Sequence, residues 1–541
     1  MGDPIWSVDA TLKAKGFSLS FPPSTYRGSI YPHGNRVTIE IELHDLTFVE
    51  LPKVTLIDRG SLQEKTLAHL NADNTICYVG EAGLPLDLYE PGGSVLRILR
   101  ETEIALERSF GDQAANDFEA ELASYWGGAY NVYVALPPST AKGIEHAEFL
   151  DIGTAETPLF MVVSTGKWKH LPTRSRRPIR IISLPNKLKY EPAFKSKSLA
   201  GIINWLGSKA LIRDAIIAAT AASEHIFLNS PNALIGWKPA LPANLKMLQK
   251  AGSIRKAFLE KKVAKSLGDI GLERMIGIRF DLQTIVQRNL LAKTSLAGKK
   301  ISLIGAGTIG GNLARLLVQA GAGCGEGFAI YDTDVFRPGN LGRHVLGFAD
   351  IDRAKADAMA SFLRGFHPDV QVRPFHRNAL TEWNALERSD LIIDATGEYN
   401  VAIALNDLRM KSTRDGNELA ILHTWVFGNG IAAQTFLNLK DNFGCYRCLR
   451  PIFDGPWRYA PVKDIKKLPD MAPAICGEAG YIPFAADAPV TAASLALRAS
   501  LDWAAKRPGQ RLRTITLDYD DGKDVKWTSP LRINGCPACG S

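Results

Sequence analysis

The chain has 541 residues, of which 46% are hydrophobic and 22% charged, and its formal net charge is +8. This composition is ordinary for a globular protein, and the length suggests about three domains. The small excess of positive charge does not indicate a nucleic-acid partner. Seven cysteines in a chain of this length fit a reducing compartment. Because the sequence shows neither an apolar run of membrane-spanning length nor a signal-peptide pattern, we expect a cytoplasmic protein.

The first region, residues 1–128, combines strand and helix patterns. Polar and apolar residues alternate over 37–43, which is typical of a strand, and apolar residues recur at helical spacing over 94–110 and 114–126. We therefore expect a small antiparallel sheet followed by helices, an α+β domain.

The segment from His69 to Cys77 carries the chemistry of this region. It resembles the active-site stretch of ubiquitin-conjugating enzymes, in which a His-Pro-Asn turn leads to an acceptor cysteine, although Leu70 replaces the proline. The resemblance implies that Cys77 accepts an acyl group and that the Asn71 amide steadies the oxyanion when an amine attacks the thioester. His69 would be structural, and the alternative for Cys77 is a packing role.

The middle region, residues 129–290, has the weakest pattern. A basic, proline-containing stretch over 174–180 lies among short strands, and helical spacing occurs over 209–223. The basic stretch lacks the interleaved aromatic residues of many nucleic-acid surfaces, which favours a solvated linker. We expect a middle α/β region that contains a linker.

In the last region, residues 291–541, strand and helix patterns alternate, which predicts a doubly wound parallel sheet. A buried-strand run over 301–304 leads into a turn with Gly305, Gly307 and Gly310 in the GxGxxG spacing. Such glycines let a backbone approach phosphates, and the following helix offers free N–H groups. The motif alone also fits an NAD-binding oxidoreductase, and Asp332 at the end of the next strand suits a ribose in either case.

Charged and polar side chains after the second and later strands favour a triphosphate. Asp334, Asn340, Arg343 and Lys355 follow the second strand, and Asp394 ends a later one. Two cations can hold phosphate oxygens while a carboxylate holds Mg²⁺. We therefore expect ATP and Mg²⁺ at the carboxyl ends of these strands.

Two CxxC pairs predict a metal site. Cys445 with Cys448 and Cys536 with Cys539 can supply four thiolates to one tetrahedral ion, and this ligand set predicts a structural Zn²⁺. Cys476 lies between the two pairs in the sequence and cannot be placed in that site, which leaves it as a candidate nucleophile.

The last region resembles the adenylation core of the ThiF family, which includes ubiquitin-activating enzymes and activators of sulfur-carrier proteins. The resemblance rests on the glycine turn, Asp332-Thr333-Asp334, Asn340-Leu341-Gly342-Arg343, Lys355, Asp394-Ala395-Thr396 and the two cysteine pairs. It implies that Asp332 binds the ATP ribose, that Asn340, Arg343 and Lys355 bind phosphates, and that Asp394 holds Mg²⁺.

The same resemblance implies further roles. Cys476, just before a helix expected over 490–505, matches the thioester cysteine of family members, and the alternative is a buried packing thiol. Gly397 and Glu398 replace the usual Asp-Asn. A partner subunit often lends an arginine, for which Arg279 and Arg288 are both candidates, so a homodimer is expected. The middle region would then be an inactive adenylation-like half or a dimerisation region.

A conjugating-type domain joined to an activating-type domain resembles bacterial fusion proteins of anti-phage defence operons, including CBASS. The resemblance implies that a partner's C-terminal tail, from a ubiquitin-like protein or a nucleotidyltransferase, is adenylated, carried as a thioester by Cys476 and then Cys77, and joined to an acceptor amine. Membranes and nucleic acid are not expected as partners. The alternatives are a sulfur-carrier adenylyltransferase with a docking module and a non-catalytic nucleotide-binding scaffold.

Overall fold

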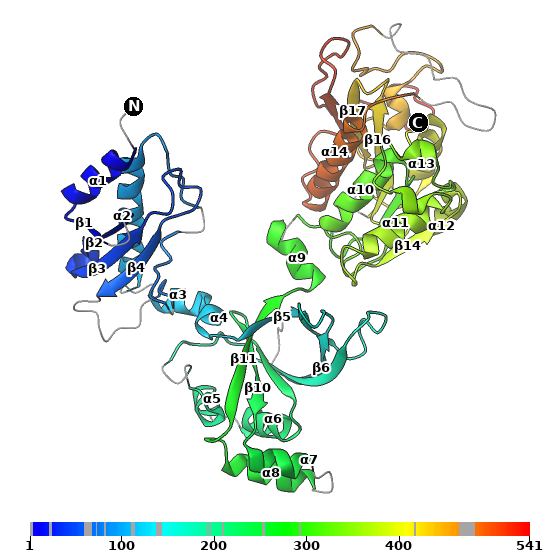
Figure 1. Ribbon diagram of the computed structural model, residues 1–541. Coiled ribbons are helices and arrows are strands. Elements are labelled where there is room, and N and C mark those ends of the chain that lie inside the picture. The colour runs from blue at the N-terminus through cyan, green and yellow to red at the C-terminus, as the bar shows by residue number, and fades with distance from the viewer. Residues whose placement is uncertain are drawn as a thin grey trace. The chain divides into compact units, whose positions relative to one another are not determined.

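The computed structural model divides into two compact units, Met1–Arg279 and Phe280–Ser541 (Figure 1). It describes residues 4–20, 24–58, 68–71, 73–79, 83–109, 114–136, 143–191, 194, 196–207, 210–250, 255–290, 294–415, 418–464 and 482–540. Within these ranges we find no helix that combines the length and the apolar character needed to cross a membrane.

The first unit begins with an α+β domain, as the sequence predicts. Its antiparallel sheet has the order β1 (Ser18–Ser20), β2 (Thr25–Ile30), β3 (Val37–Glu42) and β4 (Lys53–Asp58). The helices are α1 (Pro4–Ala14), α2 (Pro91–Arg108), α3 (Ala114–Ala120) and α4 (Leu122–Tyr125). Alternate residues of β3 are buried, and they pack with α1 and α2 in one apolar core. Removing this apolar surface from water stabilises the domain.

The second part of the first unit is a closed barrel with its own core. Its strands are β5 (Tyr130–Ala135), β6 (Gly143–Asp151), β7 (Phe160–Ser164), β8 (Ser175–Ser183), β9 (His225–Asn229), β10 (Leu234–Ala240) and β11 (Gly271–Arg279). They close in the order β10-β11-β5-β7-β6-β8-β9. Successive side chains of a strand point to opposite faces, so Phe227 packs inside the barrel while its neighbours Ile226 and Leu228 pack in a second core.

That second core lies between the barrel and its helices. The helices are α5 (Leu199–Trp205), α6 (Ala210–Ala221), α7 (Ala243–Lys250) and α8 (Lys256–Lys265). The ring of Trp126 lies 5.1 Å from Phe194 and 6.3 Å from Trp237, and its indole N–H donates to the Gly236 carbonyl oxygen at 3.1 Å. Residues just after α4 therefore anchor the first domain to the barrel.

The basic stretch is not a linker. Residues 175–183 form β8, which pairs with β6 and β9. Arg176 binds Glu148 on the neighbouring strand, and the Arg180 guanidinium donates to Glu224 at 2.9 Å. The expectation of a solvated linker is wrong here because carboxylates distant in sequence lie opposite these arginines.

The second unit is the doubly wound sheet that the sequence predicts. Its strands are β12 (Ile301–Ile304), β13 (Phe328–Tyr331), β14 (Val372–Phe375), β15 (Leu391–Asp394), β16 (Ala420–Phe427), β17 (Ala432–Asn438) and β18 (Leu512–Thr516). The order is β14-β13-β12-β15-β16-β17-β18, parallel from β14 to β16 and antiparallel beyond.

Helices cover both faces of this sheet. They are α9 (Leu282–Asn289), α10 (Thr308–Gln319), α11 (Lys355–Arg364), α12 (Trp383–Leu386), α13 (Tyr399–Lys411) and α14 (Asp487–Ala504). Helices α10, α11 and α14 share the larger core, and α12 and α13 contribute to the opposite one. From β12 the chain runs first to β13 and later, on the other side, to β15. Ligands bind where strand order reverses in this way.

Candidate functional site

A cavity of about 470 Å³ opens at the carboxyl end of β12, where the strand order reverses. Most of the residues that the sequence predicts for nucleotide binding line it: Gly305, Gly307, Asp332, Asp334, Asn340, Arg343 and Lys355. They come from four separate stretches of chain. The parallel strands bring these stretches to the same edge of the sheet.

The glycine turn brings backbone close to the cavity. Gly305 has a φ of +87°, a conformation in which a side chain would be strained. A Cβ atom on Gly310, in the first turn of α10, would lie 1.8 Å from the Gly305 carbonyl oxygen, whereas one on Gly307 would meet nothing within 4 Å. Gly310 therefore allows the helix to approach the turn, and Gly307 leaves room in front of the free N–H groups of α10.

We expect a Gly310→Ala variant to lose stability and a Gly307→Ala variant to lose mainly nucleotide affinity. The methyl group added by Gly310→Ala would force the turn and the helix apart, which would lower the free energy of unfolding by about 3 kcal/mol. Denaturant unfolding followed by a probe in the second unit, together with ATP titration, separates the two effects. Equal stability of the two variants would contradict this account of the turn.

Asp332 is held firmly at the end of β13. Its carboxylate oxygens accept hydrogen bonds from the backbone N–H groups of Ala306 (2.6 Å) and Asp334 (2.7 Å). Burial raises the pKa of Asp332, and the two N–H donors oppose that shift. The carboxylate thus joins the glycine turn to the next strand, in the position predicted for ribose binding.

The two predicted cations have different surroundings. Lys355, at the start of α11, is only 7% exposed, and its ammonium donates to Asp334 at 2.9 Å. The Arg343 guanidinium lies 4.9 Å from the centre of the Phe484 ring, which also lines the cavity. Asn340 accepts a hydrogen bond from the Arg337 backbone N–H (2.9 Å) through its side-chain oxygen, which orders the loop between them.

Asp394, the predicted Mg²⁺ ligand, is 2% exposed at the end of β15. One carboxylate oxygen accepts from the Thr396 hydroxyl (2.7 Å), and the other contacts His423 Nδ1 (2.9 Å). Thr396 and Glu398 line the cavity. In this conformation Thr396 and His423 orient the Asp394 carboxylate, and its two oxygens together keep further lone pairs that a metal could use.

The structure adds cavity residues that the sequence did not single out. Arg377, Asn378 and Phe484 line the cavity beside Glu398, which was noted only as a departure from the family pattern. Arg377 and Asn378 follow β14 closely, as Asp332 follows β13. Their place directly after a parallel strand was the available signal.

The two arginines considered as lent residues lie in different units. Arg279 ends β11 of the barrel, where its guanidinium donates to the Asn229 side chain at 2.8 Å. Arg288 is exposed near the end of α9 in the second unit. Arg279 would have to give up its bond to Asn229 to reach a second subunit, whereas the exposed side chain of Arg288 would not have to break that contact. Which of the two arginines acts in a partner subunit stays a prediction.

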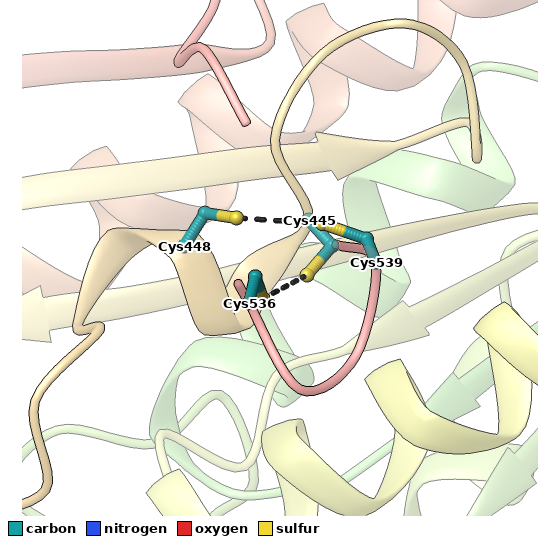
Figure 2. Close-up of side chains that lie close together, drawn as sticks. All are labelled: Cys445, Cys448, Cys536 and Cys539. Atoms are coloured by element: carbon teal, nitrogen blue, oxygen red, sulfur yellow. Dashed lines mark hydrogen bonds between the residues drawn. The ribbon is translucent and has the colours of Figure 1, made fainter. Parts of the chain in front are cut away.

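The four cysteines of the CxxC pairs lie together (Figure 2). The four Sγ atoms all lie within 4.8 Å of one another, and the four residues are at most 7% exposed. A hydrogen bond from Cys445 lowers the pKa of Cys448, and the same bond raises the pKa of Cys445. Four buried thiols from two short hooks fit the ligand set of a structural Zn²⁺ ion.

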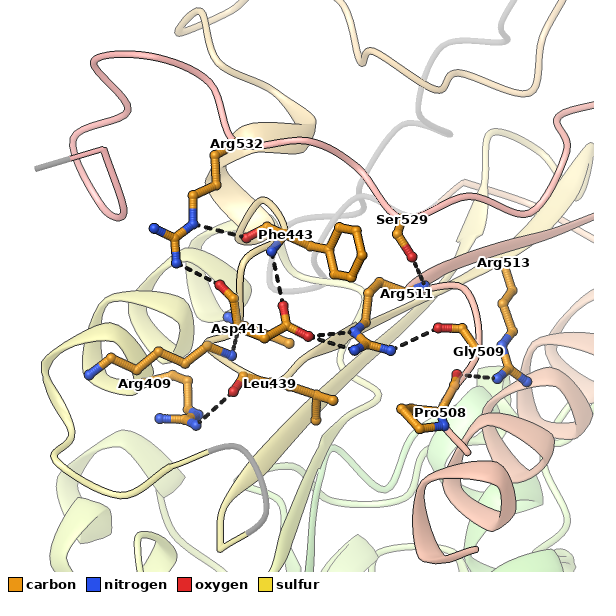
Figure 3. Close-up of polar contacts among 12 residues, drawn as sticks. Arg409, Leu439, Asp441, Phe443, Pro508, Gly509, Arg511, Arg513, Ser529 and Arg532 are labelled. Carbon is orange, nitrogen blue, oxygen red and sulfur yellow. Dashed lines mark hydrogen bonds and ion pairs between the residues drawn. The ribbon is translucent and has the colours of Figure 1, made fainter. Parts of the chain in front are cut away.

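Polar contacts around Asp441 bring the two hooks together, although they are far apart in sequence (Figure 3). The Asp441 carboxylate accepts from Arg511 at 3.0 Å, and its carbonyl oxygen accepts from Arg532 at 2.5 Å. The Gly444 N–H donates to the Pro530 carbonyl oxygen at 2.6 Å. These bonds fix the segment that precedes the first cysteine pair to the segment that precedes the second.

We expect a Cys536→Ser, Cys539→Ser double variant to lose bound zinc and to unfold at a lower temperature, because metal binding to such a site contributes directly to folding. Metal analysis of the purified protein and a thermal scan measure both effects. Cys324→Ser is the matched control, since Cys324 is half-buried outside this cluster. If the double variant retained all of its zinc, these thiols would not be the ligands of the metal.

Of the two predicted thioester cysteines, the structure describes only Cys77. Cys77 is exposed, so an acyl group can reach it. Asn71, predicted to steady the oxyanion, is exposed as well, and its side-chain amide donates to the Thr75 hydroxyl at 2.9 Å. Cys476 lies outside the described residues. The helix expected after it is α14, which begins at Asp487.

Comparison with known proteins identifies both ends of the chain. Residues 7–135 match the model of prokaryotic E2 family B, and residues 284–517 match that of the ThiF family. The ATP-dependent ubiquitin transferase-like protein Cap2 of Pseudomonas aeruginosa is 28% identical over 524 residues, covering 93% of this chain and 91% of the relative. Cap2 of Escherichia coli is 24% identical and covers 74% of each chain. The SAMP-activating enzyme E1 of Haloferax volcanii is 28% identical over 250 residues, 45% of this chain and 82% of its own.

Proposed function

Because the chain joins a ubiquitin-conjugating-like domain to a ThiF-type adenylation domain, we propose that it adenylates the C-terminus of a partner protein with ATP and conjugates that C-terminus to an amine. The observation that carries the proposal is the cavity at the strand-order reversal. It gathers the glycine turn, a fixed carboxylate and two cations around one space. These groups suit a nucleotide that undergoes substitution at a phosphorus atom, because they can stabilise the charge that develops on its phosphate oxygens.

In the first step a carboxylate oxygen of the partner attacks the α-phosphorus of ATP, and pyrophosphate leaves. Lys355 and Arg343 offset the negative charge on the phosphate oxygens, while the N–H groups at the start of α10 donate to them. Asp332 accepts from the ribose hydroxyls. A bound Mg²⁺ ion would neutralise further phosphate charge, with Asp394 as its predicted ligand. The exposed carboxylate of Asp334 lines the cavity and is a second candidate ligand.

Two thioesters then carry the acyl group. The Cys476 thiolate attacks the acyl-adenylate and releases AMP, and the Cys77 thiolate takes the acyl group from Cys476. An amine attacks the second thioester, forms an amide and frees Cys77. Since both cysteines belong to one chain, the transfer between them proceeds at a high effective concentration.

The cellular role belongs to the same proposal. The similarity to Cap2 proteins over most of the chain supports a protein substrate, and the fusion resembles those of anti-phage operons. We propose that the activated tail belongs to a ubiquitin-like protein or a nucleotidyltransferase of such a system, and that the enzyme works as a homodimer in the cytoplasm.

The test uses the full chain with ATP, magnesium and the tail of a protein encoded beside it. We expect ATP–pyrophosphate exchange and an adduct that a thiol reagent removes by thioester exchange. Cys476→Ala should keep the exchange and lose the adduct, because adenylation precedes the attack of this thiol. Thiocarboxylate formed from added sulfide would instead indicate a sulfur-carrier activator. A chain that shows neither exchange nor adduct overturns the proposal.

A further inference from the structure

Helices α7 and α8 of the barrel carry most of the chain's excess positive charge. Residues 246–265 contain seven basic residues and one acidic residue, which gives this segment a net charge of +6, whereas the whole chain has +8. The expectation that nucleic acid is not a partner rests on the charge of the whole chain and on the stretch over 174–180. Neither of them reveals that the charge is concentrated on two neighbouring helices.

The cations of α8 lie on one side of that helix. Arg255, Phe258, Lys262 and Lys265 follow one another at intervals of three and four residues, so they form one row along the helix, and Lys261 lies next to this row. All five residues are exposed. The apolar residues of α8 pack into the core beneath the helices. The helix therefore presents a basic side to solvent.

Helix α7 packs against α8 and adds two further cations (Figure 1). Its residues Lys246 and Lys250 are exposed and four residues apart, so they share one side of α7, while Leu245 is buried in the core. We call the exposed cations of these two helices the basic face, which consists of Lys246, Lys250, Arg255, Lys261, Lys262 and Lys265.

Neighbouring carboxylates do not neutralise the basic face. In the part of the chain that the structure describes, no ion pair joins any of its cations to an aspartate or a glutamate. Glu260, the acidic residue of the segment, lies 4.0 Å from Lys256, which is outside the face. The arginines of β8 differ, since Arg176 and Arg180 each bind a carboxylate. The charge of the basic face is therefore available to a partner.

An exposed aromatic ring lies within the row of cations on α8. Phe258 is 47% exposed, and the Lys262 ammonium lies 5.3 Å from the centre of its ring. Proteins that bind single-stranded nucleic acid combine cations along the backbone with aromatic rings on which bases stack. Because the bases of a duplex are already stacked and paired, the exposed ring favours a single strand.

We propose that the basic face binds single-stranded nucleic acid, with its lysines on the phosphates and Phe258 stacked on a base. The composition of the face favours nucleic acid over an acidic protein, because five of its six cations are lysines and lysine is depleted at protein–protein interfaces. Binding to phosphates releases the counterions condensed around the strand, which supplies affinity without a deep groove. The inference goes beyond the proposed function and does not depend on it.

The experiment uses the full chain and fluorescently labelled single strands of about 20 nucleotides. One strand is a deoxythymidine polymer and the other a uridine polymer, and we expect both to bind because they share phosphates and base rings. Fluorescence anisotropy gives the dissociation constant at salt concentrations from about 0.05 to 0.2 M. We expect values of about 1 to 100 µM at the highest salt concentration and tighter binding at the lowest.

A triple variant tests the lysines of α8. It carries Lys261→Gln, Lys262→Gln and Lys265→Gln, since glutamine removes the charge while it keeps the helix propensity of lysine. The slope of log affinity against log salt concentration should become shallower by about 3. Binding at the lowest salt concentration should weaken by about 10-fold or more.

The matched control removes the same charge from exposed positions of the same barrel outside the two helices. It carries Lys169→Gln, Lys187→Gln and Lys197→Gln. Its affinity should stay within about 2-fold of the parent, because salt screens charges that are distant from the bound strand. Thermal scans of both triple variants verify that they are folded.

A Phe258→Ala variant tests the stacking contact. It should weaken binding of the single strands by about 5-fold or more and leave the salt slope unchanged, since no charge is removed. Binding of a duplex of the same length should change by less than about 2-fold.

Several results would overturn the inference. These are no binding at about 100 µM protein and the lowest salt concentration, or equal affinities of the parent and the α8 lysine variant. Displacement of the strand by an equal charge of polyglutamate would mean that the face binds acidic polymers in general, acidic proteins included. Unchanged single-strand binding by Phe258→Ala would remove the assignment to a single strand. None of these measurements uses ATP or a partner tail, so the proposed function is tested separately.

Discussion

A Cys77→Ala variant, given ATP, magnesium and its partner tail, will hold the acyl group on Cys476 and form no conjugate. The methyl side chain cannot take the acyl group, so the first thioester has no onward path, while the adenylation cavity in the other unit is untouched. Non-reducing gel electrophoresis will show the accumulated adduct, and mass spectrometry will show the missing amide.

Cys324→Ala controls for the loss of a thiol as such, since Cys324 is half-buried and burial raises its pKa. It should conjugate at the rate of the parent chain. Undiminished conjugation by Cys77→Ala would instead mean that the amine attacks the Cys476 thioester directly. The first domain would then serve for docking.

Local patterns were sufficient to predict the parallel part of the second unit and most of its nucleotide cavity. The glycine turn, Asp332 and the two cysteine hooks are short stretches whose chemistry depends on spacing along the chain. A parallel sheet with short connections brings such stretches to one edge in a known way. The strand predicted over 301–304 and the helix predicted over 490–505 are confirmed as β12 and α14, whereas the antiparallel strands β17 and β18 were not predicted. The four thiols meet although the hooks are far apart in sequence.

The barrel could not be predicted from local patterns. Its strand order mixes parallel and antiparallel neighbours, so each strand's partners are set by packing rather than by chain order. The arginines of β8 look like solvated charges in the sequence, and only the fold places Glu148 and Glu224 opposite them. Charge balance across strands requires knowledge of strand order.

Side-chain partners were also beyond the sequence. Asp394 was expected at the end of a strand, where it lies, but its contacts with His423 and Thr396 depend on how β16 pairs beside β15. The carboxylates next to His69 had a usable signal, because Asp117, Glu121 and Tyr125 recur at helical spacing. Which histidine they face follows only from the tertiary structure.

Replacing Lys355 by alanine will lower the rate of ATP–pyrophosphate exchange by about 100- to 1,000-fold, the loss typical of removing one preorganised charge-stabilising donor. Lys355 is 7% exposed on the cavity wall, so its ammonium acts with little screening by water. In the resting protein it binds the exposed carboxylate of Asp334. Phosphate oxygens can replace that carboxylate, after which the cation offsets charge that grows as pyrophosphate leaves.

Arg353→Ala is the matched control for Lys355→Ala. It removes the same charge two positions away, but Arg353 pairs with Asp350 on the surface and does not line the cavity. Its exchange rate should stay within about 2-fold of the parent, since surface ion pairs contribute little. Measuring the maximal rate and the Michaelis constant for ATP separately then locates the effect: a Lys355 cation that stabilises the transition state lowers the maximal rate, whereas one that only binds ATP raises the Michaelis constant. Exchange by Lys355→Ala at the rate of the control would mean that this buried cation serves only to hold Asp334 in the resting protein.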